Sequence, residues 1–182
     1  MGWKRFSMSN LRLINETTIA NGTSSSITND LFNADFDIYN LQIKRTLASA
    51  TGGISLRLVN SSGSIIPQLF DFAYLGLNAH ATFHEGRGQN NSFFQYLDWS
   101  SGTVADQSSI NLYVFNPFSS SSYTFFMNQT FSTYSPAGLS TNGFKGIAVA
   151  KNTSSATGIQ LQPSQGGTFG LEIRTYGLRV DS

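Results

Sequence analysis

The sequence has no cysteine among its 182 residues, so it offers neither a disulfide framework nor thiol chemistry. Charge is scarce as well: Asp, Glu, Lys and Arg make up 12% of the chain, against roughly 25% in an average globular protein. The formal net charge of +1 provides no electrostatic attraction to nucleic acid or to an anionic membrane. We therefore expect neither nucleic acid nor a membrane as a partner.

Long hydrophobic runs are missing too. No stretch approaches the roughly 20 apolar residues that a membrane-spanning helix needs. Residues 1–8 are basic at Lys4 and Arg5 but lack the apolar segment of a signal peptide. The sequence thus predicts neither a membrane span nor a secretory leader.

Uncharged polar residues take the place of the missing charges: 26 Ser, 16 Thr and 15 Asn make up 57 of the 182 residues. Aromatic residues account for 13%, which argues against a disordered chain despite the serine runs. This composition is typical of a rigid β module, and it suits a protein that works within an assembly, because few charges would need desolvation on contact. A soluble β domain with unusual loops is the plainer alternative.

Short stretches with alternating apolar residues recur along the chain, separated by Gly, Pro, Asn or Ser clusters, and no helical period appears. This pattern predicts an all-β protein, an antiparallel β-sandwich with a jelly-roll-like arrangement of about nine or ten strands. The main expected strands are residues 11–20, 37–47, 54–59, 69–77, 92–99, 109–115, 123–131, 143–150, 157–162 and 167–180, with a shorter segment at 24–28.

The last expected strand changes phase midway. Phe169, Leu171 and Ile173 share one face of an extended chain, whereas the apolar residues after Thr175 fall one position out of step. We therefore expect a β-bulge or a bend near residues 174–176. The residues of the second apolar set are Tyr176, Leu178 and Val180. In an oligomer this second half would face a neighbouring subunit, which makes Tyr176 and Leu178 candidate assembly residues.

The length suits one sizeable core, so we expect an N-terminal arm at residues 1–9 and a single β-sandwich domain at residues 10–182. The arm places two aromatic residues around two basic ones. These residues are Trp3, Lys4, Arg5 and Phe6. A mobile tail is one interpretation, and an arm that docks on a neighbouring subunit or on a larger shell is the other.

The densest group of chemically versatile side chains lies in residues 78–91 and forms a candidate ligand loop. Its members are His80, His84, Glu85, Arg87, Asn90 and Asn91. In an extended chain the two histidines share a face, but a zinc site needs three or four ligands and the adjacent glutamate points to the other face. The pattern therefore favours a polar surface loop over a metal site, and we expect neither a metal nor a cofactor.

Catalytic motifs do not occur. The sequence has no G-x-S-x-G elbow, no P-loop and no dinucleotide fingerprint. Its ten acidic residues are scattered, and several, such as Asp35, Asp37 and Asp98, sit at apparent strand ends, where turn or surface roles are common. A triad assembled from distant residues stays open because triads are defined by geometry. The sequence favours a protein that is not an enzyme.

Glycan binding is a further candidate, because sugar contacts commonly combine an aromatic face with amide and hydroxyl groups. Trp99, Tyr96 and Tyr134, with Asn90 and Asn91, are the natural choices. For each aromatic residue taken alone, a place in the core is favoured over a place in a binding site.

The two ends of the chain together resemble a family of small β-rich proteins of tailed bacteriophages. The opening segment "SNLRLINETTIANGTSSSITNDLFNADFDIYNLQIK" and the closing segment "TGIQLQPSQGGTFGLEIRTYGL" carry the resemblance, which covers most of residues 10–180. The histidine-containing middle departs from the family pattern, and the ending "TYGLRVDS" is longer than the usual one.

The resemblance implies a jelly-roll-like sandwich on the exterior of a virion, often as a homotrimer. It implies a non-enzymatic structural protein of the capsid decoration, cement or head-fibre type that contacts the major capsid protein. The alternative is a receptor- or glycan-binding module of a tail fibre or tail spike, with a tail component and a host-surface glycan as partners.

Overall fold

The computed structural model describes residues 11–23, 25–79, 83–99, 108–134 and 140–178, and these contain eleven β-strands and no helix. The strands are β1 (Leu11–Gly22), β2 (Ser26–Thr28), β3 (Ile38–Ala48), β4 (Ile54–Val59), β5 (Phe70–Asn78), β6 (His84–Asn91), β7 (Ser108–Phe115), β8 (Thr124–Tyr134), β9 (Ser140–Ala150), β10 (Gly158–Pro163) and β11 (Phe169–Leu178). Within this described part of the chain, no helix is long and apolar enough to cross a membrane.

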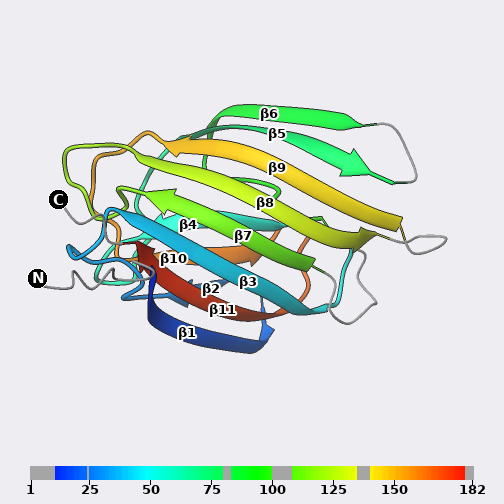
Figure 1. Ribbon diagram of the computed structural model, residues 1–182, viewed down its shortest axis with the longest axis horizontal. Helices are drawn as coiled ribbons and strands as arrows, with labels where there is room; N and C mark the ends of the chain where they lie inside the picture. Colours follow the sequence, from blue (N-terminus) through cyan, green and yellow to red (C-terminus); the bar gives the residue numbers. More distant parts are fainter. Residues whose placement is uncertain (1–10, 24, 80–82, 100–107, 135–139, 179–182) are drawn as a thin grey trace, which may run out of the picture.

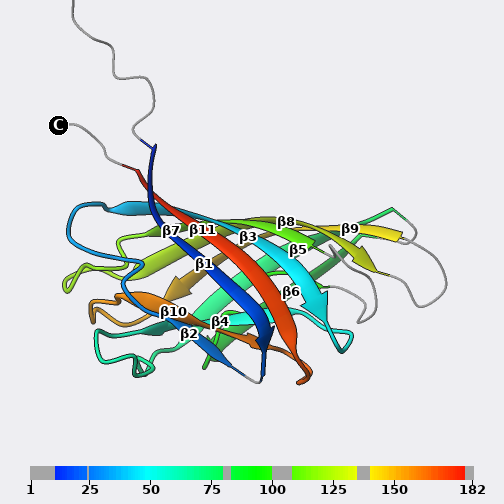
Figure 2. The ribbon, with the colours of Figure 1, turned by 90° about the horizontal axis from the view of Figure 1, so that it is seen from below.

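The strands form two sheets that face each other (Figures 1 and 2). The large sheet has eight strands in the order β1-β11-β3-β7-β8-β9-β5-β6, and the small sheet has three in the order β2-β10-β4. Neighbouring strands pair antiparallel throughout both sheets. The predicted all-β class and antiparallel β-sandwich are therefore confirmed, with eleven strands in place of nine or ten.

The core lies between the two sheets and is built from alternate residues of the strands. Leu41 and Ile43 of β3 meet Leu161 of β10 and Leu56 of β4 in one cluster of buried side chains. Each such side chain stabilises the fold by about 1.5–3 kcal/mol through loss of apolar surface from water. The small sheet lies behind β11, β3 and β7 in Figure 1, while β5 and β6 extend beyond it.

The closing strand β11 does not change phase. Its pairing with β3 is unbroken from Leu171 to Leu178, so the bulge expected near residues 174–176 is absent from this strand. Thr175 is fully buried, and Gly177 faces inward with the Phe36 ring over it, where a Cβ would lie 2.5 Å from the ring. The prediction was wrong because the inner positions continue with a small polar residue and a glycine, which an apolar pattern does not reveal.

The outer face of β11 therefore carries the second apolar set. Tyr176 and Leu178 alternate with the buried positions and point away from the small sheet. The irregularity near this point lies in the neighbouring strand β1, between Leu13 and Asn15. A bulge there lets β1 follow the curved edge of the sheet.

Residues 92–99, expected as a strand, instead form an irregular segment that runs beside β4 and contacts the inner face of the large sheet. Phe94 forms an isolated bridge with Leu56 of β4. The Leu97 amide donates to the carbonyl of Ile54, and the Leu97 carbonyl accepts hydrogen bonds from Asn128 and Thr130 of β8. The apolar residues of this segment do alternate, but their side chains pack into the core at the end of the sandwich that the small sheet does not cover.

Asp98, expected at the surface, is fully buried and ties this segment to three strands. Its Oδ2 accepts from the Arg45 guanidinium of β3 at 3.2 Å and from the Ser108 hydroxyl of β7 at 2.6 Å. Its Oδ1 accepts from the backbone amide of Ile54 of β4 at 2.7 Å. Arg45 also donates to the Gly52 carbonyl at 3.0 Å. Buried carboxylates persist only with such partners, so we name this group the Asp98 clamp.

Replacing Asp98 with Ala should lower the free energy of unfolding by about 3–5 kcal/mol, because it leaves the buried Arg45 charge without its carboxylate. Chemical denaturation followed by fluorescence measures the change. Asp35→Ala, at an exposed position, should stay within about 0.5 kcal/mol of the wild type. Equal stability of the Asp98→Ala variant and the wild type would contradict the role of the clamp.

Candidate functional site

An aromatic pocket lies at the end of the sandwich where residues 92–99 approach the inner faces of β5, β6 and β9. It encloses about 300 Å³ and is lined by Tyr74, Asn78, His84, Tyr96, Trp99, Asn142 and Phe144. We call these seven residues the aromatic pocket. Its members come from three strands and one crossing segment, so only the folded chain brings them together.

Glycines of β6 make room for the rings of β5. Gly86 lies opposite Tyr74, and a Cβ at this position would be 2.4 Å from the Tyr74 ring. On the other strand, the His84 imidazole lies over Gly76, where a Cβ would be 2.2 Å from it. Any larger residue at these positions would displace a ring, which accounts for the alternating glycines of "HEGRG".

The rings of the pocket contact one another in sequence. The centroids of Trp99 and Tyr96 are 5.5 Å apart, those of Tyr96 and Tyr74 are 5.5 Å apart, and those of Tyr74 and Phe144 are 5.8 Å apart. His84 completes the wall at 5.4 Å from Phe144. These separations lie within the range of favourable aromatic pairs, so the wall is held by its own contacts.

Tyr96 has an unusual backbone conformation. Its φ of +59° lies in the left-handed region, which costs energy for a residue that carries a side chain. The conformation sets the Tyr96 ring between Tyr74 and Trp99. Burial, and then the neighbouring Tyr96 phenol, raise the pKa of Tyr74 above its ordinary value, so the Tyr74 hydroxyl keeps its proton.

The polar groups of the pocket are amides, phenols, an indole and an imidazole. Asn142 is 3% exposed, and its Oδ1 accepts no hydrogen bond from any described residue. None of the seven lining residues is Asp, Glu, Lys or Arg. The arrangement can stack a ligand and hydrogen-bond to it, but it holds no carboxylate pair for acid–base catalysis.

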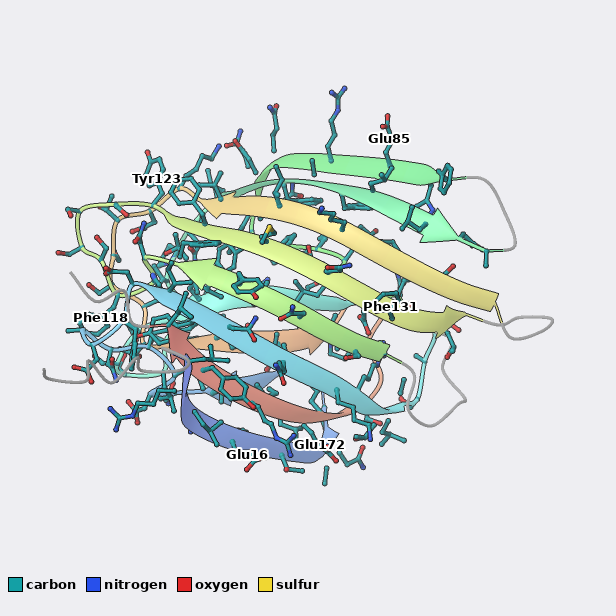
Figure 3. All side chains as sticks on the ribbon, viewed as in Figure 1. Glu16, Glu85, Phe118, Tyr123, Phe131 and Glu172 are labelled. Carbon is teal, nitrogen blue, oxygen red and sulfur yellow. The ribbon has the colours of Figure 1, made fainter. Side chains whose placement is uncertain are left out.

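The expected ligand loop is largely a strand, because β6 begins at His84 and pairs with β5 along the edge of the large sheet. Sequence analysis missed it because β6 carries glycines and polar residues where strands usually carry β-branched ones. His84 faces the pocket, whereas Glu85 and Arg87 project from the other side of the strand, as Figure 3 shows for Glu85. His80 lies outside the described residues.

Asn90 and Asn91 stand at the opposite end of β6 from His84. The Asn90 amide donates to Asp71 at 2.9 Å, and Lys151 donates to the Asn90 side chain at 2.6 Å. The Lys151 ammonium also bonds Asp71 at 2.8 Å, and this hydrogen bond lowers the pKa of the Asp71 carboxyl. The five described residues of the expected loop therefore do not converge on one site. Across the described ranges, no three His, Asp or Glu side chains gather where they could hold a metal.

Two of the three aromatic residues singled out for glycan contact, Tyr96 and Trp99, line the pocket and are only partly buried. The side chain of Tyr134 lies outside the described part. Tyr74, Asn142 and Phe144 were missed, because only the pairing of β5 with β9 sets Gly76 opposite Phe144 and Asn78 opposite Asn142. The one signal in the sequence was the alternation within the expected strand at residues 69–77, which places Tyr74 on the inward side.

A second surface of note is the outer face of the large sheet, turned toward the viewer in Figure 3. Cross-strand pairing aligns its outward side chains in two rows that run from β1 to β9. The first row is Leu11, Leu178, Ile38, Phe115, Phe125 and Val149, and the second is Leu13, Tyr176, Asn40, Tyr113, Met127 and Ile147. Leu75, Leu77 and Phe131 point to the same side from the next two rows, which otherwise carry mostly polar residues. We call this set the apolar face.

The apolar face contains both of the predicted assembly residues of β11, Tyr176 and Leu178, and a groove of about 640 Å³ runs over it between β5 and β8. β1 starts at Leu11, at one end of the first row. The other predicted assembly residues, Trp3, Lys4, Arg5 and Phe6, lie outside the described residues.

The pH dependence of stability should reveal the buried environment of Tyr74 in the pocket. Burial raises the pKa of Tyr74 and of Tyr39 above the ordinary value of about 10. Their contribution to stability is therefore present below about pH 10 and is lost as the pH rises through the raised pKa values. We expect the free energy of unfolding to fall as the pH rises above about 10, and to fall less in Tyr74→Phe.

Urea denaturation at a series of pH values measures this profile. Tyr123→Phe, at an exposed position, is the matched control and should follow the wild type. An identical loss of stability in Tyr74→Phe and the wild type would show that the Tyr74 phenol is not desolvated.

Comparison with known proteins adds no relative to this geometry. No family model matches the chain, and no curated protein or solved structure matches it.

Proposed function

We propose that the protein is a non-enzymatic structural module that associates with a second copy of itself through the apolar face. The observation that carries the proposal is the pair of rows of outward, mainly apolar side chains across six neighbouring strands of one sheet. A strand with one side in water normally carries polar residues on that side. Here two neighbouring rows are apolar apart from Asn40, and polar residues gather in the rows beside them.

The apolar face exposes several large side chains. Eight of them are between 39% and 61% exposed. They are Leu11, Leu13, Leu75, Leu77, Phe125, Met127, Phe131 and Ile147. Single exposed apolar residues are common on a protein surface, but a group of them on one face of one sheet marks an interaction site.

Charge favours a second copy as the occupant. The row next to the apolar rows contains Glu85 and Lys145 at one end, and Arg174 bonded to Glu16 at 2.6 Å at the other. The two signs balance within this row, so the same row in a second copy can approach it without net repulsion. The same balance provides no attraction to a strongly charged partner.

Packing of two apolar faces would create the geometry of another sandwich. Sheets pack face to face about 10 Å apart with interdigitating side chains. The stacked rings of Tyr113 and Phe115, with centroids 6.4 Å apart, give the middle of the face a rigid surface for such a contact. Aromatic anchors of this kind carry most of the binding energy in many interfaces.

The resemblance to tailed-phage proteins supplies the setting of the proposal. The module decorates the exterior of a virion and contacts the capsid shell or a tail component, and the homotrimer that the resemblance implies is the alternative to the face-to-face pair. Face-to-face pairing and trimer assembly predict different copy numbers, so the measured stoichiometry decides between them.

Charged residues placed in the apolar face should separate the copies. We expect the wild type to run as an oligomer in light scattering coupled to size exclusion, and the Met127→Asp/Ile147→Asp variant to run as a monomer. Tyr176→Lys/Leu178→Lys should do the same from the other end of the face. Gln42→Asp/Thr18→Asp adds the same charge at exposed outward positions of polar rows and should leave the oligomer intact.

Circular dichroism melting confirms that each variant remains folded, since all of these positions are on the surface. A wild type that is monomeric at tens of micromolar would overturn the proposal. So would a Met127→Asp/Ile147→Asp variant that keeps the wild-type mass.

The virion setting has its own test in the copy number of the protein in purified particles. Quantitative mass spectrometry against the major shell protein should find hundreds of copies per particle if the module decorates the capsid. A dozen or so would move it to the tail. Absence from the particle would refute the virion setting while leaving the self-association result in place.

A further inference from the structure

We infer that the aromatic pocket binds an uncharged saccharide, with a pyranose ring stacked against Tyr96 and Trp99. This inference goes beyond the proposed function and does not depend on it. The pocket is lined by inward side chains of β5 and β9 and by residues 92–99, whereas the apolar face is on the other side of the large sheet. Each can fail without the other.

The aromatic wall supplies a stacking surface. One face of a pyranose ring presents C–H groups, and these pack favourably on the electron-rich faces of indole and phenol rings. Tyr96 and Trp99 are both partly exposed, and their rings are 40° apart in orientation with centroids 5.5 Å apart. Buried core rings would offer no such surface. The left-handed backbone of Tyr96 holds this pair in place before any ligand arrives.

The polar groups of the pocket fit sugar hydroxyls. Asn142 is buried, and its Oδ1 is without a hydrogen bond from the described part of the chain, although such a buried acceptor costs about 1–3 kcal/mol when unsatisfied. A hydroxyl group that donates to this oxygen would satisfy it. The His84 ring and the Asn78 amide line the same space and offer further donors and acceptors.

The absence of charge selects the class of saccharide. None of the seven lining residues is Asp, Glu, Lys or Arg, so a phosphate or a carboxylate would be desolvated there without a permanently charged partner. A neutral hexose meets no such penalty. The volume of about 300 Å³ is at the lower end of ligand pockets, which suits one or two sugar rings.

The position of the stacking pair also depends on the core. Leu97 and Asp98, which precede Trp99, are held by hydrogen bonds to β4 and β8 and by the Asp98 clamp. The stacking pair therefore sits on a fixed segment rather than on a free loop. A pre-formed surface loses less entropy when a ligand binds.

Fluorescence of Trp99 provides a direct test. The chain has two tryptophans, so Trp3→Phe leaves Trp99 as the reporter. The probes are the methyl glycosides of glucose, galactose, mannose and N-acetylglucosamine, each titrated to high millimolar concentration. We expect at least one to change the emission saturably, and saturation-transfer NMR to show its ring protons in contact with the protein.

Variants locate the binding. In saturation-transfer NMR, Trp99→Ala and Tyr96→Ala should each weaken binding of the active glycoside at least tenfold. Asn142→Leu should weaken it similarly if the Oδ1 accepts from a hydroxyl. Phe131→Ala, which removes an exposed aromatic ring from the apolar face, is the matched control and should bind as the wild type does.

Three outcomes would overturn the inference. The first is that none of the four glycosides binds saturably. The second is that binding survives in Trp99→Ala and Tyr96→Ala. The third is that adenosine binds more tightly than every glycoside, which would assign the stacking pair to a nucleobase. The monomeric Met127→Asp/Ile147→Asp variant should bind the active glycoside normally, which separates this result from that of the self-association test.

Discussion

The burial of one carboxylate is the constraint on which the rest of the structure depends. Asp98 accepts hydrogen bonds from Arg45, Ser108 and the Ile54 amide, so it joins two strands of the large sheet to one of the small sheet. A buried carboxylate demands such partners, because its desolvation otherwise costs several kcal/mol. Once it is in place, the adjoining segment must lie beside β4 and against the inner face of the large sheet, and Tyr96 and Trp99 are carried to the end of that face.

The unequal size of the two sheets explains why the molecule has two distinct surfaces. Three strands cannot cover eight, so residues 92–99 fill part of the remaining inner face and a pocket is left beside them. The outer face of the large sheet has no covering layer among the described residues, yet two neighbouring rows of its side chains are mainly apolar. The two surfaces lie on opposite sides of β5 and β9, so the proposed self-association and the proposed saccharide binding would use separate parts of the molecule.

Sequence reasoning identified strands correctly where the alternation of apolar residues alone decides the structure. It failed where contacts with distant residues of the same chain decide it. The alternation in residues 109–115 correctly identified β7. The same signal in residues 92–99 marks a segment that is not a strand, because Leu97 and Asp98 bond to other strands through side chains and isolated amides. In β6 the opposite error occurred, because a strand was expected to be a loop. Its glycines are typical of loops, but here they leave room for the Tyr74 and Phe72 rings that lie over them.

The amino-acid sequence by itself determined the all-β class, the positions of most strands and the scarcity of charge, because these follow from local alternation and composition. Only the tertiary structure decided which face of β11 is buried, since that depends on the Phe36 ring over Gly177. It also decided the pocket and the apolar face, because both are built from residues far apart in the chain. Their contacts arise from strand order and register, and no local pattern encodes either one.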